Sequence, residues 1–280
     1  MKFCRIAVGA IGLCVWSLGA SLQAELIIED TFTGYLDNAL ISDSPAGPAL
    51  GLTGDWELAP NSGDFYVNRT QADNDAGTGK AVYDMPVDYN GTRIATRSTS
   101  TDHVLFANDG DKFYASFLID PARASGDMTF ELALRTLAGG GALDFSFGII
   151  NGQYIVGNGG VGVSIGGGTV TADEQLVLVR VEYGDENTGL DDNEVVTLWV
   201  NPFDESSTPV IDGISADILT RGGGTIGAVS MRGDHMSGAP AFFDNLRVGT
   251  SFGEVVPEPA TLSLFAMGLI VLIPVMRRRR

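Results

Sequence analysis

Acidic residues at spacings that suit a bound cation are the first candidates for chemistry in this chain. Asp73 and Asp75 stand in the sequence Asp-Asn-Asp-Ala-Gly, and this D-x-D-x-G spacing is that of the first part of a calcium loop. Alternate oxygens in such a loop converge on one ion as the glycine turns the chain. The later bidentate acid of an EF-hand is missing, so the match to that motif is partial.

A second candidate calcium site joins the two ends of the predicted domain. Period-two alternation puts Asp244 on a largely apolar face of the last predicted strand, together with Phe242 and Leu246. A buried carboxylate without a partner is costly. If the first strand lies alongside, Glu29 or Asp30 completes a structural calcium site with Asp244. The alternatives are a β-bulge that turns Asp244 outward, or an arginine or backbone donor as its partner.

The residues needed for covalent catalysis are missing or scattered. The only cysteines are Cys4 and Cys14, near the N-terminus. The G-x-S-x-G spacing occurs at residues 162–166 and 249–253, but neither leads into the long helical pattern that follows the serine of a nucleophile elbow. His103 and His235 lie far apart in sequence, each in a polar segment. We therefore predict no catalytic residues and a protein that is not an enzyme, with a triad scattered along the chain as the alternative.

The first 24 residues have the pattern of a secretory signal peptide. Lys2 and Arg5 form a short basic region, residues 6–18 are apolar, and small and polar residues follow. We expect a signal helix and cleavage after Ala24, with Ala20 as the alternative cut. Both cysteines are lost with this segment, so the mature domain must be held by its core rather than by disulfides.

Residues 254–280 consist of three blocks, each with its own physical character. Val256, Pro257, Glu258 and Pro259 form a proline-bracketed acid, which favours an extended, accessible linker. Residues 260–276 carry no charge and are long enough to predict a transmembrane helix. The chain then ends in a cluster that should stay cytoplasmic and places the preceding domain on the other side of the membrane: Arg277, Arg278, Arg279 and Arg280.

The order of these three blocks resembles the PEP-CTERM sorting signal of exported bacterial proteins. The resemblance implies that the tail holds the protein in the inner membrane, with the domain on the periplasmic side, until an exosortase cuts near residues 257–259. It implies export machinery as a further partner, and a mature form at the cell surface or in the extracellular matrix. A plain C-terminal membrane anchor is the alternative.

Residues 25–253 are predicted to form one all-β domain. Short apolar runs are separated by Gly, Asn, Asp, Ser and Pro, which favours an antiparallel β-sandwich. Residues 113–119, 128–134 and 143–149 alternate with period two, as expected for a sheet wetted on one side. Residues 176–181 and 195–200 are more uniformly apolar and are predicted to be central strands.

An ordered set of short sequences gives this domain a second resemblance. The set runs from Glu29-Asp30-Thr31-Phe32 through Gly51-Leu52-Thr53-Gly54-Asp55-Trp56 to a close at residues 243–252. It resembles the concanavalin A-like, or laminin G-like, jelly-roll domains. The resemblance implies two stacked antiparallel sheets with the first and last strands adjacent. Glucanases of that fold class carry carboxylates as E-x-D-x-E on one strand, and this pattern is absent here.

Charge limits the partners of the exported region. Residues 25–256 hold 11 basic and 34 acidic side chains, a net charge near −23. Nucleic acid and anionic lipid are therefore poor partners, whereas neutral glycans and divalent cations are better ones. Sugars would stack on exposed aromatics, and the candidates are Trp56, Tyr66, Tyr83, Tyr89 and Tyr154. The alternative for each of them, and for Trp199, is a place in the core.

These observations predict an exported, non-enzymatic surface or matrix protein whose β-sandwich binds exopolysaccharide. One alternative is a purely structural matrix component bridged by calcium. Another is a glycan-active hydrolase with a non-standard site.

Overall fold

The computed structural model describes the domain between the two predicted processing signals, with gaps. The described residues are 24–32, 35–36, 39–43, 45, 47, 49–59, 65–68, 81–83, 92–104, 110–120, 127–134, 145–150, 152–157, 165–170, 174–182, 194–216, 225–234 and 242–256. The predicted signal helix and residues 260–276 lie outside this set. Within it, no helix combines the length and the apolar character needed to cross a membrane.

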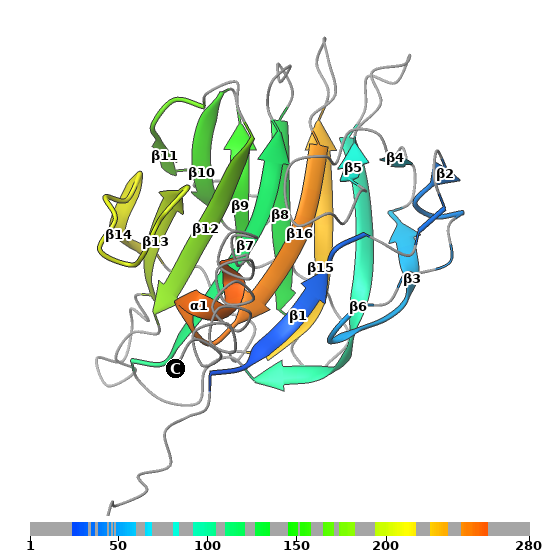
Figure 1. The fold of residues 1–280 in the computed structure, drawn as a ribbon, viewed down its shortest axis with the longest axis horizontal. Helices are drawn as coiled ribbons and strands as arrows, with labels where there is room; N and C mark the ends of the chain where they lie inside the picture. The colour runs from blue at the N-terminus through cyan, green and yellow to red at the C-terminus, as the bar shows by residue number, and fades with distance from the viewer. Residues whose placement is uncertain are drawn as a thin grey trace, which may run out of the picture.

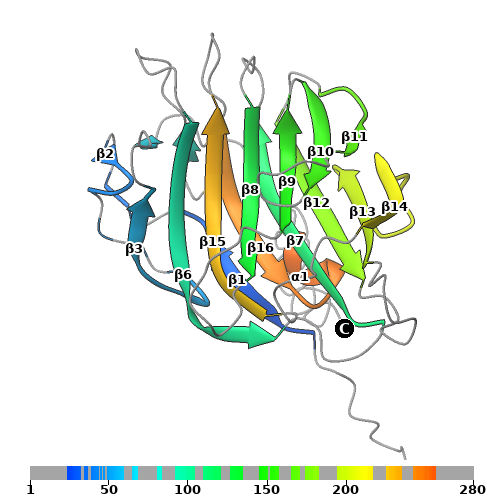
Figure 2. The same ribbon diagram turned by 180° about the vertical axis from the view of Figure 1, so that it is seen from behind.

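Two antiparallel sheets make up the described part of the chain (Figures 1 and 2). The first sheet has the order β14 (Ile211–Ala216), β13 (Glu194–Val200), β12 (Gln175–Glu182), β7 (Lys112–Asp120), β16 (Phe242–Gly249), β5 (Ala81–Tyr83), β4 (Tyr66–Asn68) and β2 (Ala39–Leu40), and β1 (Leu26–Asp30) also pairs with β16. The second sheet has the order β11 (Ile165–Gly167), β10 (Gln153–Gly157), β9 (Phe145–Ile150), β8 (Asp127–Leu134), β15 (Thr225–Asp234), β6 (Thr92–Val104) and β3 (Leu52–Leu58). The one described helix is α1 (Phe252–Val255). The all-β, antiparallel prediction is therefore confirmed.

Alternating side chains from both sheets meet in one core. On β7 the predicted inward residues, such as Phe113 and Phe117, are fully buried. They contact β9 across the sandwich, with ring centroids 6.1 Å apart for Phe113 and Phe145 and 5.2 Å apart for Phe117 and Phe147. The two sheets are thus stacked and joined by apolar and aromatic packing, the largest favourable term in folding.

The prediction that the sheet is wetted on its outer side is wrong at β7. Tyr114, Ser116 and Leu118 point away from the core, yet they are buried too. The covering element at the first two is α1, which packs on the outer face of the first sheet. The prediction that residues 176–181 and 195–200 form inner strands is confirmed, because β12 and β13 each have a neighbour on both sides.

The first and last strands lie side by side, as the jelly-roll resemblance implied. Leu26 pairs with Gly249, and Asp30 pairs with Leu246. Just outside this ladder the backbone N–H of Glu25 donates to Thr250 Oγ1 at 3.0 Å, and the backbone N–H of Thr250 donates to the Glu25 carbonyl at 3.0 Å. Both ends of the folded domain are therefore fixed at one corner.

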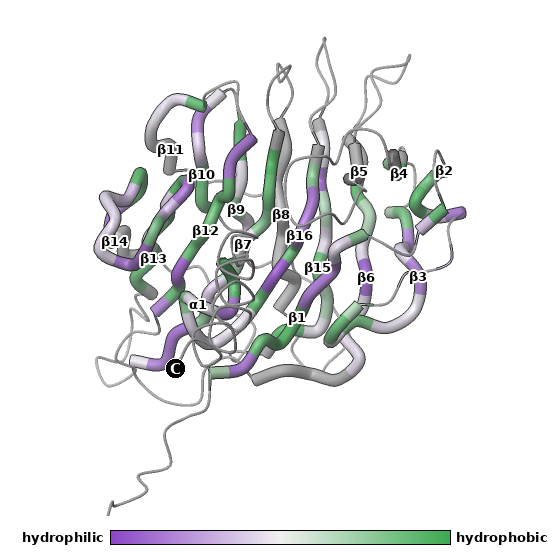
Figure 3. The backbone as a smooth tube through the Cα atoms, in the orientation of Figure 1, coloured by the Kyte–Doolittle hydropathy of each residue, from purple (hydrophilic) through white to green (hydrophobic). Residues whose placement is uncertain are grey.

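Gly249 is required at that corner by close packing. A Cβ atom added there would lie 3.0 Å from Glu254 Cβ and 3.1 Å from the Glu25 carbonyl oxygen. A side chain at this position would push α1 away from the strand pair. Figure 3 shows that β1 begins hydrophobic and ends hydrophilic. The last two residues of the strand are Glu29 and Asp30, whose polar contacts are described below.

Candidate functional site

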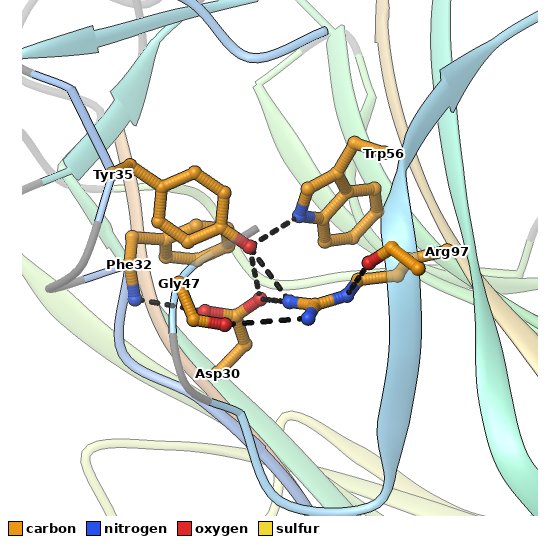
Figure 4. Close-up of polar contacts among 7 residues, drawn as sticks. Asp30, Phe32, Tyr35, Gly47, Trp56 and Arg97 are labelled. Carbon is orange, nitrogen blue, oxygen red and sulfur yellow. Dashed lines mark hydrogen bonds and ion pairs between the residues drawn. The ribbon is translucent and has the colours of Figure 1, made fainter. Parts of the chain in front are cut away.

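A closed polar cluster is buried where β1 ends (Figure 4). Asp30 Oδ2 lies 2.8 Å from Arg97 Nη1 and accepts a hydrogen bond from the Tyr35 hydroxyl at 2.8 Å. The other carboxylate oxygen, Oδ1, accepts the Phe32 backbone N–H at 2.9 Å. Trp56 Nε1 donates to the Tyr35 oxygen at 2.8 Å. We call these residues, Asp30, Phe32, Tyr35, Trp56 and Arg97, the Asp30 cluster.

Arg97 spreads its donors over three elements. Its Nη1 also donates to the Tyr35 oxygen at 2.7 Å, its Nε donates to the Gly54 carbonyl at 3.1 Å, and its Nη2 donates to the Gly47 carbonyl at 3.3 Å. One side chain on β6 thereby ties together β1, β3 and the segment between them. A guanidinium can do this because it presents five donors in a fixed planar fork.

Burial dominates the electrostatics of the Asp30 cluster. It raises the pKa of the Asp30 carboxyl, while the Phe32 N–H, the positive charge of Arg97 and the Tyr35 hydroxyl act in the opposite direction. It also raises the pKa of Tyr35, and the neighbouring Asp30 charge adds to that rise. Each of these polar groups already has a protein partner and is shielded from solvent, so the cluster is suited to holding the fold rather than to turning over a substrate.

Glu29, Asp30 and Asp244, which are predicted to bind calcium, have arginine or backbone partners in the structure, and calcium at these residues stays a prediction. Glu29 Oε1 lies 2.7 Å from Arg247 Nη2 on the neighbouring strand, and Asp30 pairs with Arg97. The register between β16 and β7 shifts between Asp244 and Arg247, and Asp244 Oδ1 accepts the Asn245 backbone N–H at 2.7 Å. This shift is the β-bulge named as an alternative at Asp244.

No metal-binding group is found in the described part of the chain. There, no three His, Asp, Glu or Cys side chains are grouped so that they could hold an ion. Asp73 and Asp75 lie outside the described residues, so calcium at that loop stays a prediction.

The aromatic residues considered for sugar stacking are buried wherever their side chains are described. Trp56 lies in the Asp30 cluster, Tyr154 lies in the main core and Trp199 lies beneath α1. The side chains of Tyr66 and Tyr83, and the whole of Tyr89, lie outside the part of the chain that the structure describes. Among described aromatics, Phe203 is strongly exposed, at 92%. A row of stacking aromatics is therefore absent from the described surface.

The junction with the predicted sorting signal forms a second, apolar cluster. Phe252 packs edge-on against Tyr114, with ring centroids 6.3 Å apart, and against Trp199, with centroids 6.4 Å apart. Val255 is fully buried against Tyr114, Leu178 and Trp199, and Val256 packs at its edge. We call residues 252–256 the docked turn.

Three hydrogen bonds hold the backbone of the docked turn. Ser116 Oγ on β7 donates to the Val255 carbonyl at 2.5 Å. The Glu254 N–H donates to the Ser251 carbonyl at 3.3 Å, and the Val256 N–H donates to the Phe252 carbonyl at 3.3 Å. The sandwich therefore packs as far as Val256, which was predicted to begin an accessible linker but is half-buried against the first sheet. Phe252, Val255 and Val256 are an apolar group just before Pro257, and this group was the sequence signal for the docking.

The loop after β13 is hydrogen-bonded to two residues of this apolar cluster. Trp199 Nε1 donates to the Ser207 carbonyl at 2.9 Å, and the Tyr114 hydroxyl donates to Glu205. Burial raises the pKa of Tyr114, and its bond to Glu205 adds to that rise. The patch that receives the docked turn is thus assembled from β7, β12 and β13, and this loop is bonded to two of its side chains.

Solved structures that are similar to this chain include three from carbohydrate biology. Endo-β-1,4-glucuronan lyase from the fungus Trichoderma reesei is 17% identical and has a TM-score of 0.43, with 75% of this chain and 97% of that chain covered. The Lotus tetragonolobus seed lectin is 9% identical with a TM-score of 0.41, covering 80% and 97%. Domain 4 of an extracellular arabinanase from Geobacillus stearothermophilus, in complex with arabinotriose, is 14% identical with a TM-score of 0.41, covering 81% and 93%. These likenesses are too distant to transfer an activity.

Comparison with curated proteins finds no match for this chain. The C-terminal segment, by contrast, matches the PEP-CTERM protein-sorting motif over residues 255–280. The matched region begins at Val255, inside the docked turn, and includes the proline-bracketed acid, the apolar segment and the terminal arginines. The chain therefore carries a PEP-CTERM sorting motif, and the first two residues of that motif belong to the folded sandwich.

Proposed function

We propose that this chain is an exported protein that an exosortase releases from the inner membrane to the cell surface or extracellular matrix. The observation that supports this most directly is the match to the sorting motif over residues 255–280. The apolar segment 260–276 would hold the chain in the membrane, and the enzyme would cut near Pro257, Glu258 and Pro259. The tail would then be a temporary handle rather than a lasting anchor.

Mass spectrometry of the protein recovered from its native envelope tests this function. We expect the mature form to begin at Glu25 and to lack the residues that follow the Pro-Glu-Pro sequence. A Glu258→Ala variant should keep the tail and accumulate in the inner membrane. Recovery of the wild-type protein from its final location with Arg277–Arg280 still attached would reject the proposal.

We also propose that the two sheets form a jelly roll of the concanavalin A-like kind and act without catalysis. The adjacency of β1 and β16 supports the topology. The closed hydrogen bonding of the Asp30 cluster supports a structural role for the most deeply buried acid. Assays for reducing ends or unsaturated sugars released from polysaccharides should show no turnover, and measurable turnover would favour the hydrolase alternative.

The ligand we propose for the mature domain is exopolysaccharide. The strongly acidic composition supports a neutral glycan, or one bridged through cations, over nucleic acid or anionic lipid. A pull-down with the producer's own polysaccharide, with and without calcium, tests this ligand. Saturable retention supports binding, whereas association that needs calcium and does not saturate supports the matrix alternative.

A further inference from the structure

The sorting motif and the folded domain share residues. The motif begins at Val255, and Val255 is fully buried on the outer face of the first sheet. Its carbonyl accepts the Ser116 hydroxyl, and the N–H of Val256 is bonded to Phe252. The side chain and main chain just before Pro257 are therefore occupied by contacts within the domain.

The docked turn also leaves little chain between the domain and the membrane. From Val256 to Ala260, the first residue of the apolar segment, four steps of extended proline-rich chain span only about 12 Å. The polar headgroup region of a bilayer takes up roughly 5–8 Å of that reach. Little room remains for an enzyme to close around the Pro-Glu-Pro sequence while the turn stays docked.

Detachment of the docked turn would free the backbone before Pro257 and lengthen the chain between the domain and the membrane. Thr250 remains fixed by its two backbone bonds to Glu25. From Thr250 to Ala260 the free chain would span roughly 30 Å. It would also expose backbone groups on the N-terminal side of the motif, which an enzyme that binds its substrate as an extended strand needs.

The turn is built so that it can open on its own. It is a single helical turn of four residues whose N-cap, Ser251, makes no side-chain hydrogen bond to it, and Val255 is its one fully buried residue. Short elements with few buried apolar contacts open locally at much lower free energy than the domain unfolds.

We propose that the docked turn limits the rate of tail removal: the exosortase cuts only molecules in which residues 252–256 have detached from the first sheet. This inference rests on the proposed function, because it concerns the step that removes the tail. Docking therefore sets the fraction of molecules that can be cut. After the cut, the new C-terminus can dock again on the same patch.

The test compares tail removal in full-length variants whose motif residues 255–280 are unchanged. Ser116→Ala removes the hydrogen bond to the Val255 carbonyl, and Phe252→Ala removes the edge-on ring contacts. Ser146→Ala is the matched control, since it removes a buried serine bond to a carbonyl, that of Gly157 at 3.3 Å, in the other sheet. The readout is the rate of tail loss in pulse–chase labelling of cells that carry the native envelope, with the thermal midpoint of each full-length chain as the folding check.

We expect tail loss to be about fivefold faster in Ser116→Ala, the ratio that a typical net hydrogen bond gives. We expect it to be about tenfold faster in Phe252→Ala, because two aromatic contacts are lost. Ser146→Ala should match the wild type. An unchanged or slower rate of tail loss in both Ser116→Ala and Phe252→Ala would overturn this inference, and so would an equal acceleration in Ser146→Ala. A wild-type chain that keeps its tail throughout the chase rejects the proposed function itself, and the inference with it.

Discussion

The two ends of the folded domain are secured by different chemistry. The N-terminal strand ends in the Asp30 cluster, where a fully buried acid meets a buried arginine and two aromatic side chains. The C-terminal end is held by apolar and aromatic contacts and one serine hydroxyl. A buried ion pair is difficult to separate, because each charge left behind would lie unpaired in the interior. A small apolar contact can open and close at low cost, so only the C-terminal end is suited to repeated release.

The largest expected effect lies in the Asp30 cluster. Arg97→Met should lower the free energy of unfolding by about 3–5 kcal/mol, because Asp30 loses its partner while still buried. Arg247→Met is the matched control: it breaks the partly exposed pair with Glu29 and should cost about 1 kcal/mol or less. Urea denaturation followed by tryptophan fluorescence measures both, and similar losses in the two variants would contradict the distinction between the two ends.

A smaller loss is expected from the hydroxyl at the centre of the same cluster. Tyr35→Phe removes the oxygen that receives bonds from Trp56 and Arg97 and donates to Asp30. The free energy of unfolding should fall by about 1–3 kcal/mol, because buried donors are left without an acceptor. A loss below that range in the same denaturation series would mean that the cluster rearranges around the missing oxygen.

At the C-terminal end the effect should be local rather than global. Phe252→Ala should accelerate hydrogen exchange at the Val256 amide about tenfold, through the loss of two ring contacts. The denaturation midpoint of the full-length chain should change little, and Ser146→Ala should leave Val256 exchange as it is. If Phe252→Ala lowered global stability as much as Arg97→Met, the turn would belong to the same cooperative unit as the core.

The smallest effect concerns the loop whose Ser207 and Glu205 are bonded to Trp199 and Tyr114 of the docking patch. Hydrogen bonds from the Ser206 hydroxyl and backbone N–H hold the pKa of the exposed Asp204 below its usual range. A lowered pKa in the folded state means that the stabilisation is present at pH values above 3.8 and is lost as the pH falls through the folded pKa. Val256 exchange should therefore depend on pH below about 4 in the wild type, after correction for the intrinsic exchange rate. It should depend on pH less strongly in Asp204→Ala, and identical profiles would remove the loop from the docking patch.

The sequence pattern was enough to predict the strand alternation, the sorting motif and the adjacency of the first and last strands. The alternation along residues 113–119 depends only on neighbours in sequence, and it predicted which side chains of β7 face the core. The sorting motif was likewise readable, because proline, acid, apolar segment and arginines act in their chain order. The adjacency of the first and last strands came from an ordered set of weak sequence matches, and the register of β1 and β16 confirms it.

Tertiary structure decided which groups met. Asp30 is bonded to Arg97, 67 residues away, and Val255 to Ser116, 139 residues away. Such partners depend on the register between distant strands, and a bulge like the one between Asp244 and Arg247 changes which residues lie opposite each other. The sequence alone therefore showed that an acid on an apolar face, Asp244, needed a partner, whereas only the folded chain brought Arg97 to Asp30 and Ser116 to Val255.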